Sequence, residues 1–191
     1  MKKIILILLF LSFNYDLVAN SLEGSKVPNS RIKMLNGKYA KLSEYYEDGP
    51  VIINFWTTWW PNCEMQAAYL NQLNQGFDNA GLKVLGVNIN SPKILNQVRP
   101  WINKRKIGFD ISVDPSGKLS DKFDVKGLPT LFLVDKNGTI INKTAGFVDG
   151  DESKYLEVLT QYLDSENISY EDFNFEKENK AKKDAILEID F

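Results

Sequence analysis

The residues best suited to chemistry lie in one short stretch, Trp59-Trp60-Pro61-Asn62-Cys63, which contains the single cysteine of the chain. The 191 residues include no His, which excludes a Ser-His-Asp triad, a Cys–His pair, His-ligated zinc and haem held by His. One Cys also excludes an internal disulfide and a Cys-rich metal site. Cys63 is therefore a lone thiol, and the sequence predicts neither a bound metal nor a cofactor.

The overall composition is that of an ordinary globular domain. Hydrophobic residues make up 43% of the chain and charged residues 25%, and the formal net charge is −2. No stripe of Lys and Arg stands out along the chain, so nucleic acid is not an expected partner.

The N-terminal segment has the pattern of an export signal. Lys2 and Lys3 are followed by an apolar run over residues 4–13. A helix that spans a bilayer needs about 20 apolar residues, so this run is too short to be an ordinary one. It predicts a signal peptide over residues 1–19, cut near Ala19, with an uncleaved membrane anchor as the alternative. We therefore expect an exported, periplasmic protein that contacts the membrane only if this segment stays uncleaved.

The elements that must position the Trp59–Cys63 stretch follow from hydrophobic patterning and turn residues. Asn36-Gly37 between two alternating stretches predicts a hairpin, and Pro61 can open a helix because its missing N–H is not needed there. The expected further strands are 51–56, 83–89, 109–113, 130–134 and 139–144, and the expected helices are 61–81, 91–106, 118–123 and one that begins after Asp149 or Asp151. The second helix is expected to be strained at Pro100. This alternation predicts an α/β fold with a parallel centre.

The end of the chain differs from the rest. Segment 165–191 carries eight acidic residues and four lysines, with apolar residues scattered among them. The pattern predicts an acidic C-terminal tail beyond a domain that covers residues 27–163. A solvated tail, or docking of its apolar end on the domain or on a partner, is compatible with this pattern.

Two segments carry a family resemblance. Residues 54–63 read N-F-W-T-T-W-W-P-N-C, and residues 125–135 read V-K-G-L-P-T-L-F-L-V-D. They resemble the thioredoxin superfamily, and most of all its exported TlpA/ResA branch of disulfide reductases, which typically reads N-F-W-A-T-W-C-P-P-C at the first place. The resemblance spans residues 27–163. It implies a thioredoxin fold with a central mixed β-sheet flanked by helices, an N-terminal β-hairpin, a helical insertion near 91–106 and a cis peptide bond before Pro129.

The chain departs from this family at the nucleophile. Trp60 occupies the position of the first Cys of the C-x-x-C motif and Cys63 that of the second, which gives a degenerate W-P-N-C. In the family the first Cys attacks a disulfide from a helix N-terminus that lowers its pKa, and the second Cys resolves the mixed disulfide. A two-Cys cycle within this chain is impossible, so whether the protein is an enzyme depends on Cys63.

Three interpretations of Cys63 remain. It falls on an apolar stripe at helical spacing behind Pro61, which favours a buried core residue without a chemical role, and the adjacent charge of Glu64 is expected to disfavour the thiolate. As a catalytic monothiol, Cys63 would form mixed disulfides that an external thiol resolves. A peroxidatic Cys is disfavoured, because the Pro and Ser/Thr positions of P-x-x-x-[ST]-x-x-C hold Trp56 and Trp60.

The resemblance implies a substrate-binding surface made by Trp59, Trp60, Pro61, Leu128 and Pro129. Trp60 stands where family members expose a sulfur beside the cis-proline loop, and an indole there would offer a flat apolar contact. Leu128 matches the position whose backbone pairs with an extended substrate. The alternative is that Trp60 folds over and plugs this groove.

Three functions are compatible with these features. The first is a redox-inactive module that binds an exported protein or peptide client, including one that contains thiols. The second is a monothiol disulfide oxidoreductase that uses Cys63. The third is a structural spacer that presents segment 165–191 to a partner. The Trp at position 60 favours the first.

Overall fold

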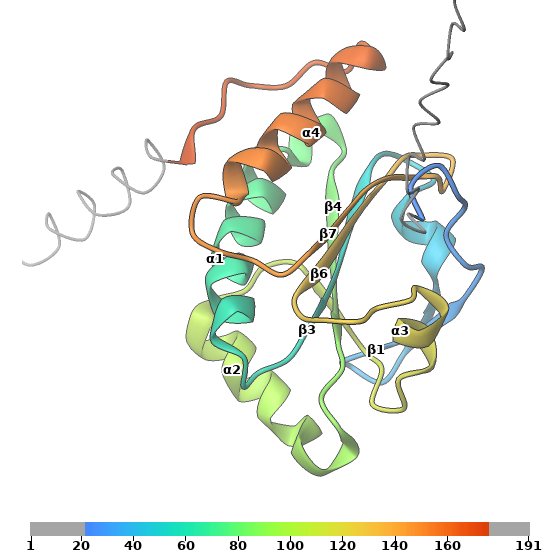
Figure 1. The fold of residues 1–191 in the computed structure, drawn as a ribbon, viewed down its shortest axis with the longest axis vertical. Coiled ribbons are helices and arrows are strands. Elements are labelled where there is room, and N and C mark those ends of the chain that lie inside the picture. Colours follow the sequence, from blue (N-terminus) through green and yellow to red (C-terminus); the bar gives the residue numbers. More distant parts are fainter. Residues whose placement is uncertain (1–21, 176–191) are drawn as a thin grey trace, which may run out of the picture.

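The computed structural model describes residues 22–175, so the predicted signal peptide over residues 1–19 lies outside the described residues. The centre of the fold is one mixed sheet of seven strands with helices on both faces (Figure 1). In order across the sheet, the strands are β2 (Tyr39–Lys41), β1 (Arg31–Met34), β5 (Asp110–Val113), β4 (Lys83–Asn88), β3 (Val51–Trp56), β6 (Thr130–Val134) and β7 (Ile140–Ala145). Strands β3, β4 and β5 pair in parallel, and the other pairs are antiparallel. The predicted α/β thioredoxin fold, with its N-terminal hairpin, is confirmed.

The helices divide between the two faces of the sheet. Within residues 22–175 they are α1 (Pro61–Gly76), α2 (Val98–Arg105), α3 (Lys118–Lys122) and α4 (Glu152–Ser165). Short 3₁₀ turns occur at η1 (Leu42–Tyr45), η2 (Asp78–Ala80) and η3 (Pro92–Gln97). Helices α1, α2 and α4 lie on one side of the sheet and α3 on the other (Figure 1). No helix of this part of the chain has the length and apolar character needed to cross a membrane.

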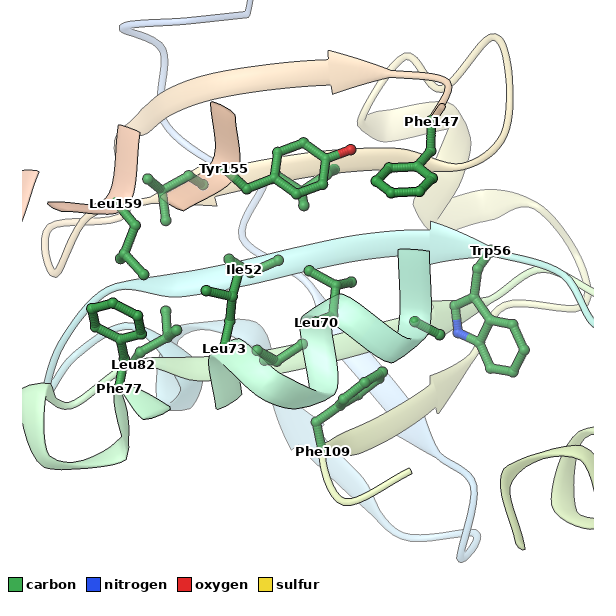
Figure 2. Packing of buried hydrophobic residues seen from close by; sticks show 14 of the residues in the cluster. Ile52, Trp56, Leu70, Leu73, Phe77, Leu82, Phe109, Phe147, Tyr155 and Leu159 are labelled. Carbon is green, nitrogen blue, oxygen red and sulfur yellow. The ribbon is translucent and has the colours of Figure 1, made fainter. Parts of the chain in front are cut away.

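Strand β3 separates two apolar cores, because successive side chains of a strand point to opposite faces of the sheet. Ile52 and Trp56 belong to the core beneath α1, α2 and α4, and Ile53 and Phe55 belong to the core beneath α3. Figure 2 shows the first core, where Leu70 points from α1 toward the sheet. All six residues of β3 are buried, which is why the run 51–56 is continuously apolar apart from one Asn.

Helix α1 begins where the sequence predicts it. Pro61 is its first residue, and Trp60 precedes it with extended backbone. The predicted apolar stripe is fully buried or nearly so, at Cys63, Ala67, Leu70, Leu73 and the following Phe77. This burial fixes the first turn of α1 against the end of β3, so the Trp59–Trp60 loop is carried on two rigid elements.

The expected helix over residues 91–106 is wrong as a single strained helix. The segment folds as the 3₁₀ turn η3 followed by α2, which begins at Val98. Pro100 therefore lies in the first turn of α2, where the N–H groups have no intrahelical partner and a proline is tolerated. Splitting the insertion into two pieces removes the strain that one continuous helix would have.

Residues 168–175 form a C-terminal strap that packs against α1 and its neighbours. The Phe173 ring lies 5.2 Å from Phe77 and 5.0 Å from Phe175, and Phe175 lies 5.4 Å from Tyr69, all measured between ring centroids. Phe175 is buried. The expectation of a solvated tail is therefore wrong for this part of segment 165–191, and the apolar residues beyond 175 lie outside the described residues.

The strap approaches α1 where that helix has no side chain. A Cβ added at Gly76 would lie 2.4 Å from the Phe173 ring. The missing side chain of Gly76 therefore makes the room that Phe173 occupies.

Candidate functional site

The loop between β3 and α1 presents an exposed pair of tryptophans. Trp59 is 58% exposed and Trp60 43% exposed. Their rings meet edge to face, with centroids 5.6 Å apart and planes at 86°. Pro61 beside them is also exposed. The structure therefore places the indole of Trp60 at the surface and in contact with Trp59.

A buried polar network, which the sequence analysis did not single out, holds this loop. The side chain of Asn90 accepts the Thr58 N–H at 3.1 Å and donates to the Thr58 hydroxyl at 2.8 Å and to the Ile94 carbonyl at 3.2 Å. The Asn90 N–H in turn donates to the side-chain oxygen of Asn88 at 3.0 Å. Both asparagines are fully buried. The signal that could have revealed them is two asparagines at and just beyond the end of an apolar strand, because buried polar groups must be hydrogen-bonded.

The second segment of the site is the turn that leads into β6. The Leu128–Pro129 peptide bond is cis. The Pro129 carbonyl accepts the Gly146 N–H at 2.7 Å, and the Thr130 hydroxyl donates to the Gly127 carbonyl at 2.7 Å. Leu128 is half-buried, and within residues 22–175 neither its N–H nor its C=O has a hydrogen-bond partner. These backbone groups are thus free to bond to a ligand.

The segment Gly146-Phe147 joins the two halves of the site. Gly146 bonds to Pro129 as described, and the side-chain amide of Asn62 donates to the Phe147 carbonyl at 2.9 Å. Phe147 and Trp56 lie at the same end of β3 (Figure 2). The structure therefore brings the first turn of α1 and the Leu128–Pro129 turn to one end of the sheet.

Cys63 lies beneath this surface and not on it. Its side chain is fully buried, and its N–H donates to the Trp60 carbonyl at 3.0 Å. Burial raises the pKa of the Cys63 thiol, and the neighbouring Thr57 opposes this only in part. Cys63 is thus held mainly as a neutral thiol in the core.

Glu64 does not set the state of the thiol, contrary to the expectation from its neighbouring position. Its carboxylate forms an ion pair with Arg105, and this contact lowers the pKa of Glu64. The Arg105 guanidinium also lies over the Trp101 ring, 4.3 Å from its centroid. The carboxylate is thus turned toward α2, and the raised pKa of Cys63 comes from burial.

We expect alkylation of Cys63 by iodoacetamide to be at least roughly 100-fold slower in the native protein than in the unfolded protein, because labelling requires a local opening of about 2.8 kcal/mol or more. The pH midpoint of the native rate is expected above the free thiol value of about 8.5. Labelling followed by mass spectrometry against pH measures both quantities. Rapid native labelling with a midpoint below that of the unfolded chain would contradict this and favour the monothiol.

Residues 22–175 contain no cluster of three or more His, Cys, Asp or Glu side chains arranged to hold a metal ion. The groups that the structure places at this end of the sheet are the exposed tryptophan pair, the Leu128 backbone and the buried Cys63 thiol.

Comparison with known proteins identifies the family to which this chain is similar. The model of the AhpC/TSA family matches residues 24–143. The thiol-disulfide oxidoreductase ResA of Geobacillus thermodenitrificans is 31% identical over 172 residues, which cover 86% of this chain and 94% of the relative. ResA of Bacillus subtilis is 31% identical over 124 residues, which cover 65% of this chain and 68% of the relative.

Solved structures agree with these matches. A putative thiol:disulfide interchange protein DsbE from Chlorobium tepidum is 26% identical with a TM-score of 0.68, and the match covers 74% of this chain and 97% of that one. StoA from Bacillus subtilis, at 22% identity and a TM-score of 0.58, shares the fold over 70% of this chain and 97% of its own. The chain belongs to the thioredoxin-like AhpC/TSA family, in the branch of the ResA-like thiol-disulfide oxidoreductases.

Proposed function

We propose that this protein is an exported, redox-inactive member of its family that binds an extended segment of another exported protein in the periplasm. One observation carries the proposal. The position of the attacking Cys holds an exposed Trp60, while the single Cys of the chain is fully buried. Binding at this surface needs no thiolate, whereas thiol–disulfide exchange does.

The surface has the groups that strand-like binding requires. The free N–H and C=O of Leu128 can bond to the backbone of an extended chain, as in recognition by strand addition. The Trp59–Trp60 pair adds a large, rigid aromatic contact of the type that dominates binding energy at interfaces. Further exposed large apolar side chains are Met65 of α1 and Val148 of the loop between β7 and α4. A client segment with aromatic or aliphatic side chains suits this combination.

The competing function is a monothiol oxidoreductase that uses Cys63. Its thiol would have to reach a substrate disulfide through the first turn of α1, and its raised pKa works against the thiolate that must attack. The geometry therefore supports binding better than catalysis.

The binding proposal is tested with an array of reduced, extended peptides that vary in aromatic and aliphatic content. Trp60→Ala and Leu128→Arg are each expected to lower the affinity for the tightest-binding peptides by about tenfold or more. Loss of an interface anchor costs more than about 1.4 kcal/mol of binding free energy. Fluorescence anisotropy of labelled peptides gives the Kd values.

Tyr39→Ala is the matched control, because Tyr39 is a comparably exposed aromatic residue on the edge strand β2. It should leave peptide affinity unchanged. If Trp60→Ala and Leu128→Arg bind the peptides as tightly as the unmodified chain does, this surface is not the binding site.

A further inference from the structure

We propose that a basic groove between β1 and α3 binds a small polyanion that carries phosphate or carboxylate groups. The groove has a volume of about 500 Å³ and is lined by β1, by the end of β5 and by α3. This volume falls in the range of sites for small organic ligands, about 300–1,000 Å³. The groove is separate from the tryptophan surface, because strand β4 lies between β5 and β3.

The charge of the groove is opposite to that of the chain. Four cationic side chains line it, Arg31 and Lys33 from β1 and Lys118 and Lys122 from α3, although the chain as a whole carries a formal charge of −2. One carboxylate, Asp114, also lines the groove. Its Oδ2 already accepts the N–H groups of Leu119 at 3.0 Å and Ser120 at 2.8 Å. The carboxylate therefore caps backbone N–H groups at the start of α3.

None of the four cations forms an ion pair with the acidic groups in the part of the chain that the structure describes, unlike Lys83 or Lys154 elsewhere. Lys122 donates only to the Ser30 hydroxyl, at 3.3 Å, and the Arg31 guanidinium lies over the Tyr39 ring, 4.2 Å from its centroid. Four cations that share one carboxylate and form no ion pair repel one another, so an anion between them is favoured.

A buried hydroxyl adds a second observation. Ser112 lines the groove and is 1% exposed, and its Oγ has no hydrogen-bond partner among the residues that the structure describes. Unpaired buried polar groups are costly and are rare in folded proteins. A ligand oxygen in the groove is a natural partner for such a group.

The position of the groove is also typical of ligand sites. It opens at the carboxyl end of β5, which runs parallel to β4, and ligands of open α/β sheets bind outside the carboxyl ends of the strands. Charge-assisted hydrogen bonds from Lys and Arg to phosphate or carboxylate oxygens are among the strong ones. Tyr39, which is 55% exposed, borders the groove and a second hollow along β2. The second hollow leaves space for the organic part of a ligand.

The test is isothermal titration of the full chain at low ionic strength with two probes, pyrophosphate for phosphate chemistry and citrate for carboxylate chemistry. We expect saturable binding of one probe per chain, and the tighter probe identifies the anionic group. The double variant Lys33→Gln/Lys118→Gln is expected to weaken that binding by about tenfold or more, because it removes two direct charge-assisted contacts.

The control Lys38→Gln/Lys93→Gln removes the same charge from exposed positions that do not line the groove. At low ionic strength distant charges are only weakly screened, so the control is expected to weaken binding through its lost net charge alone. This loss should be clearly smaller than that of the groove variant, which also loses direct charge-assisted contacts. Circular dichroism melts check that both variants fold. The proposal is overturned if neither probe binds saturably, if the groove variant binds as the unmodified chain does, or if both double variants lose affinity equally.

Discussion

Replacing Trp60 with Cys is expected to give this protein thiol–disulfide oxidoreductase activity, which we propose that the natural chain lacks. The substitution restores a C-x-x-C motif with Cys63 as the second Cys, in a chain that otherwise keeps the fold of its ResA-like relatives. In reduced form the variant should reduce the disulfides of insulin, whereas the unmodified chain should stay at background. Oxidised and reduced forms should differ by two thiols on titration with a chromogenic disulfide.

The physical reason lies in the start of α1. Position 60 directly precedes a helix of 16 residues, where the unpaired N–H groups and the helix dipole stabilise a thiolate. A shift of the pKa from about 8.5 to about 7 raises the thiolate fraction at pH 7 about 16-fold. Trp60 is exposed, so a sulfur at this position would be open to a substrate disulfide. Cys63 beneath it would then resolve the mixed disulfide.

Two further variants separate the steps of this reaction. Trp60→Ser should remain inactive, because it has the exposed position without the thiol. Trp60→Cys/Cys63→Ser should attack substrate but accumulate the mixed disulfide, visible as a mass adduct. If Trp60→Cys folds, carries two titratable thiols and still reduces insulin no faster than Trp60→Ser, loss of the nucleophile does not explain the difference from active relatives.

The double variant Phe173→Ala/Phe175→Ala is expected to lose about 4 kcal/mol of unfolding free energy. Phe175 is buried against Tyr69, and Phe173 packs on Phe77, so the two truncations leave cavities in one connected ring cluster. A buried Phe→Ala costs about 3–5 kcal/mol, and neighbouring losses are not additive. Urea denaturation followed by circular dichroism gives the change in midpoint and slope.

Glu171→Ala/Asp172→Ala is the matched control, because these strap residues are exposed and their loss leaves the rings in place. It should change stability by no more than about 0.5 kcal/mol. Unchanged stability of the phenylalanine variant would mean that the strap adds nothing to the core, and a spacer that presents a detachable tail would regain support.

Gly76→Ala tests the same contact from the helix side. Within a helix, replacing Gly with Ala normally raises the free energy of unfolding by about 0.5–1 kcal/mol. Here the added Cβ would meet the Phe173 ring at 2.4 Å, so Gly76→Ala is expected to lower the free energy of unfolding instead.

Local sequence patterns predicted the elements of the fold because each has a local cause. The run over residues 51–56 is apolar on both faces, Asn36-Gly37 turns the hairpin, and Pro61 opens α1. The segment 91–106 was predicted less well, because the first-turn position of Pro100 depends on where α2 begins. The strap could not be predicted, since the partners of Phe173 and Phe175 are far away in the sequence.

The candidate site, like the fold, has features that the sequence predicts and features that it does not. The expectation that Trp60 lies beside the Leu128–Pro129 turn came from a family resemblance, because no local spacing relates residues so far apart in the sequence. The exposure of Trp60 and the role of Asn90 depend on how loops pack at the end of the sheet. The basic groove could not be found from composition, since its cations come from β1 and α3 and meet only after the sheet has formed.

The four tryptophans of the chain fall into two optically distinct classes. Trp56 and Trp101 are buried and stack with ring centroids 4.5 Å apart, whereas Trp59 and Trp60 are exposed. Iodide should therefore quench emission from the exposed pair and spare the buried pair. Binding of a ligand at the end of the sheet would shield the exposed Trp59 and Trp60 from iodide. Unfolding would expose the buried Trp56 and Trp101. Intrinsic tryptophan fluorescence should therefore follow folding through the buried pair and, if the proposed binding occurs, occupancy through the exposed pair, without a label.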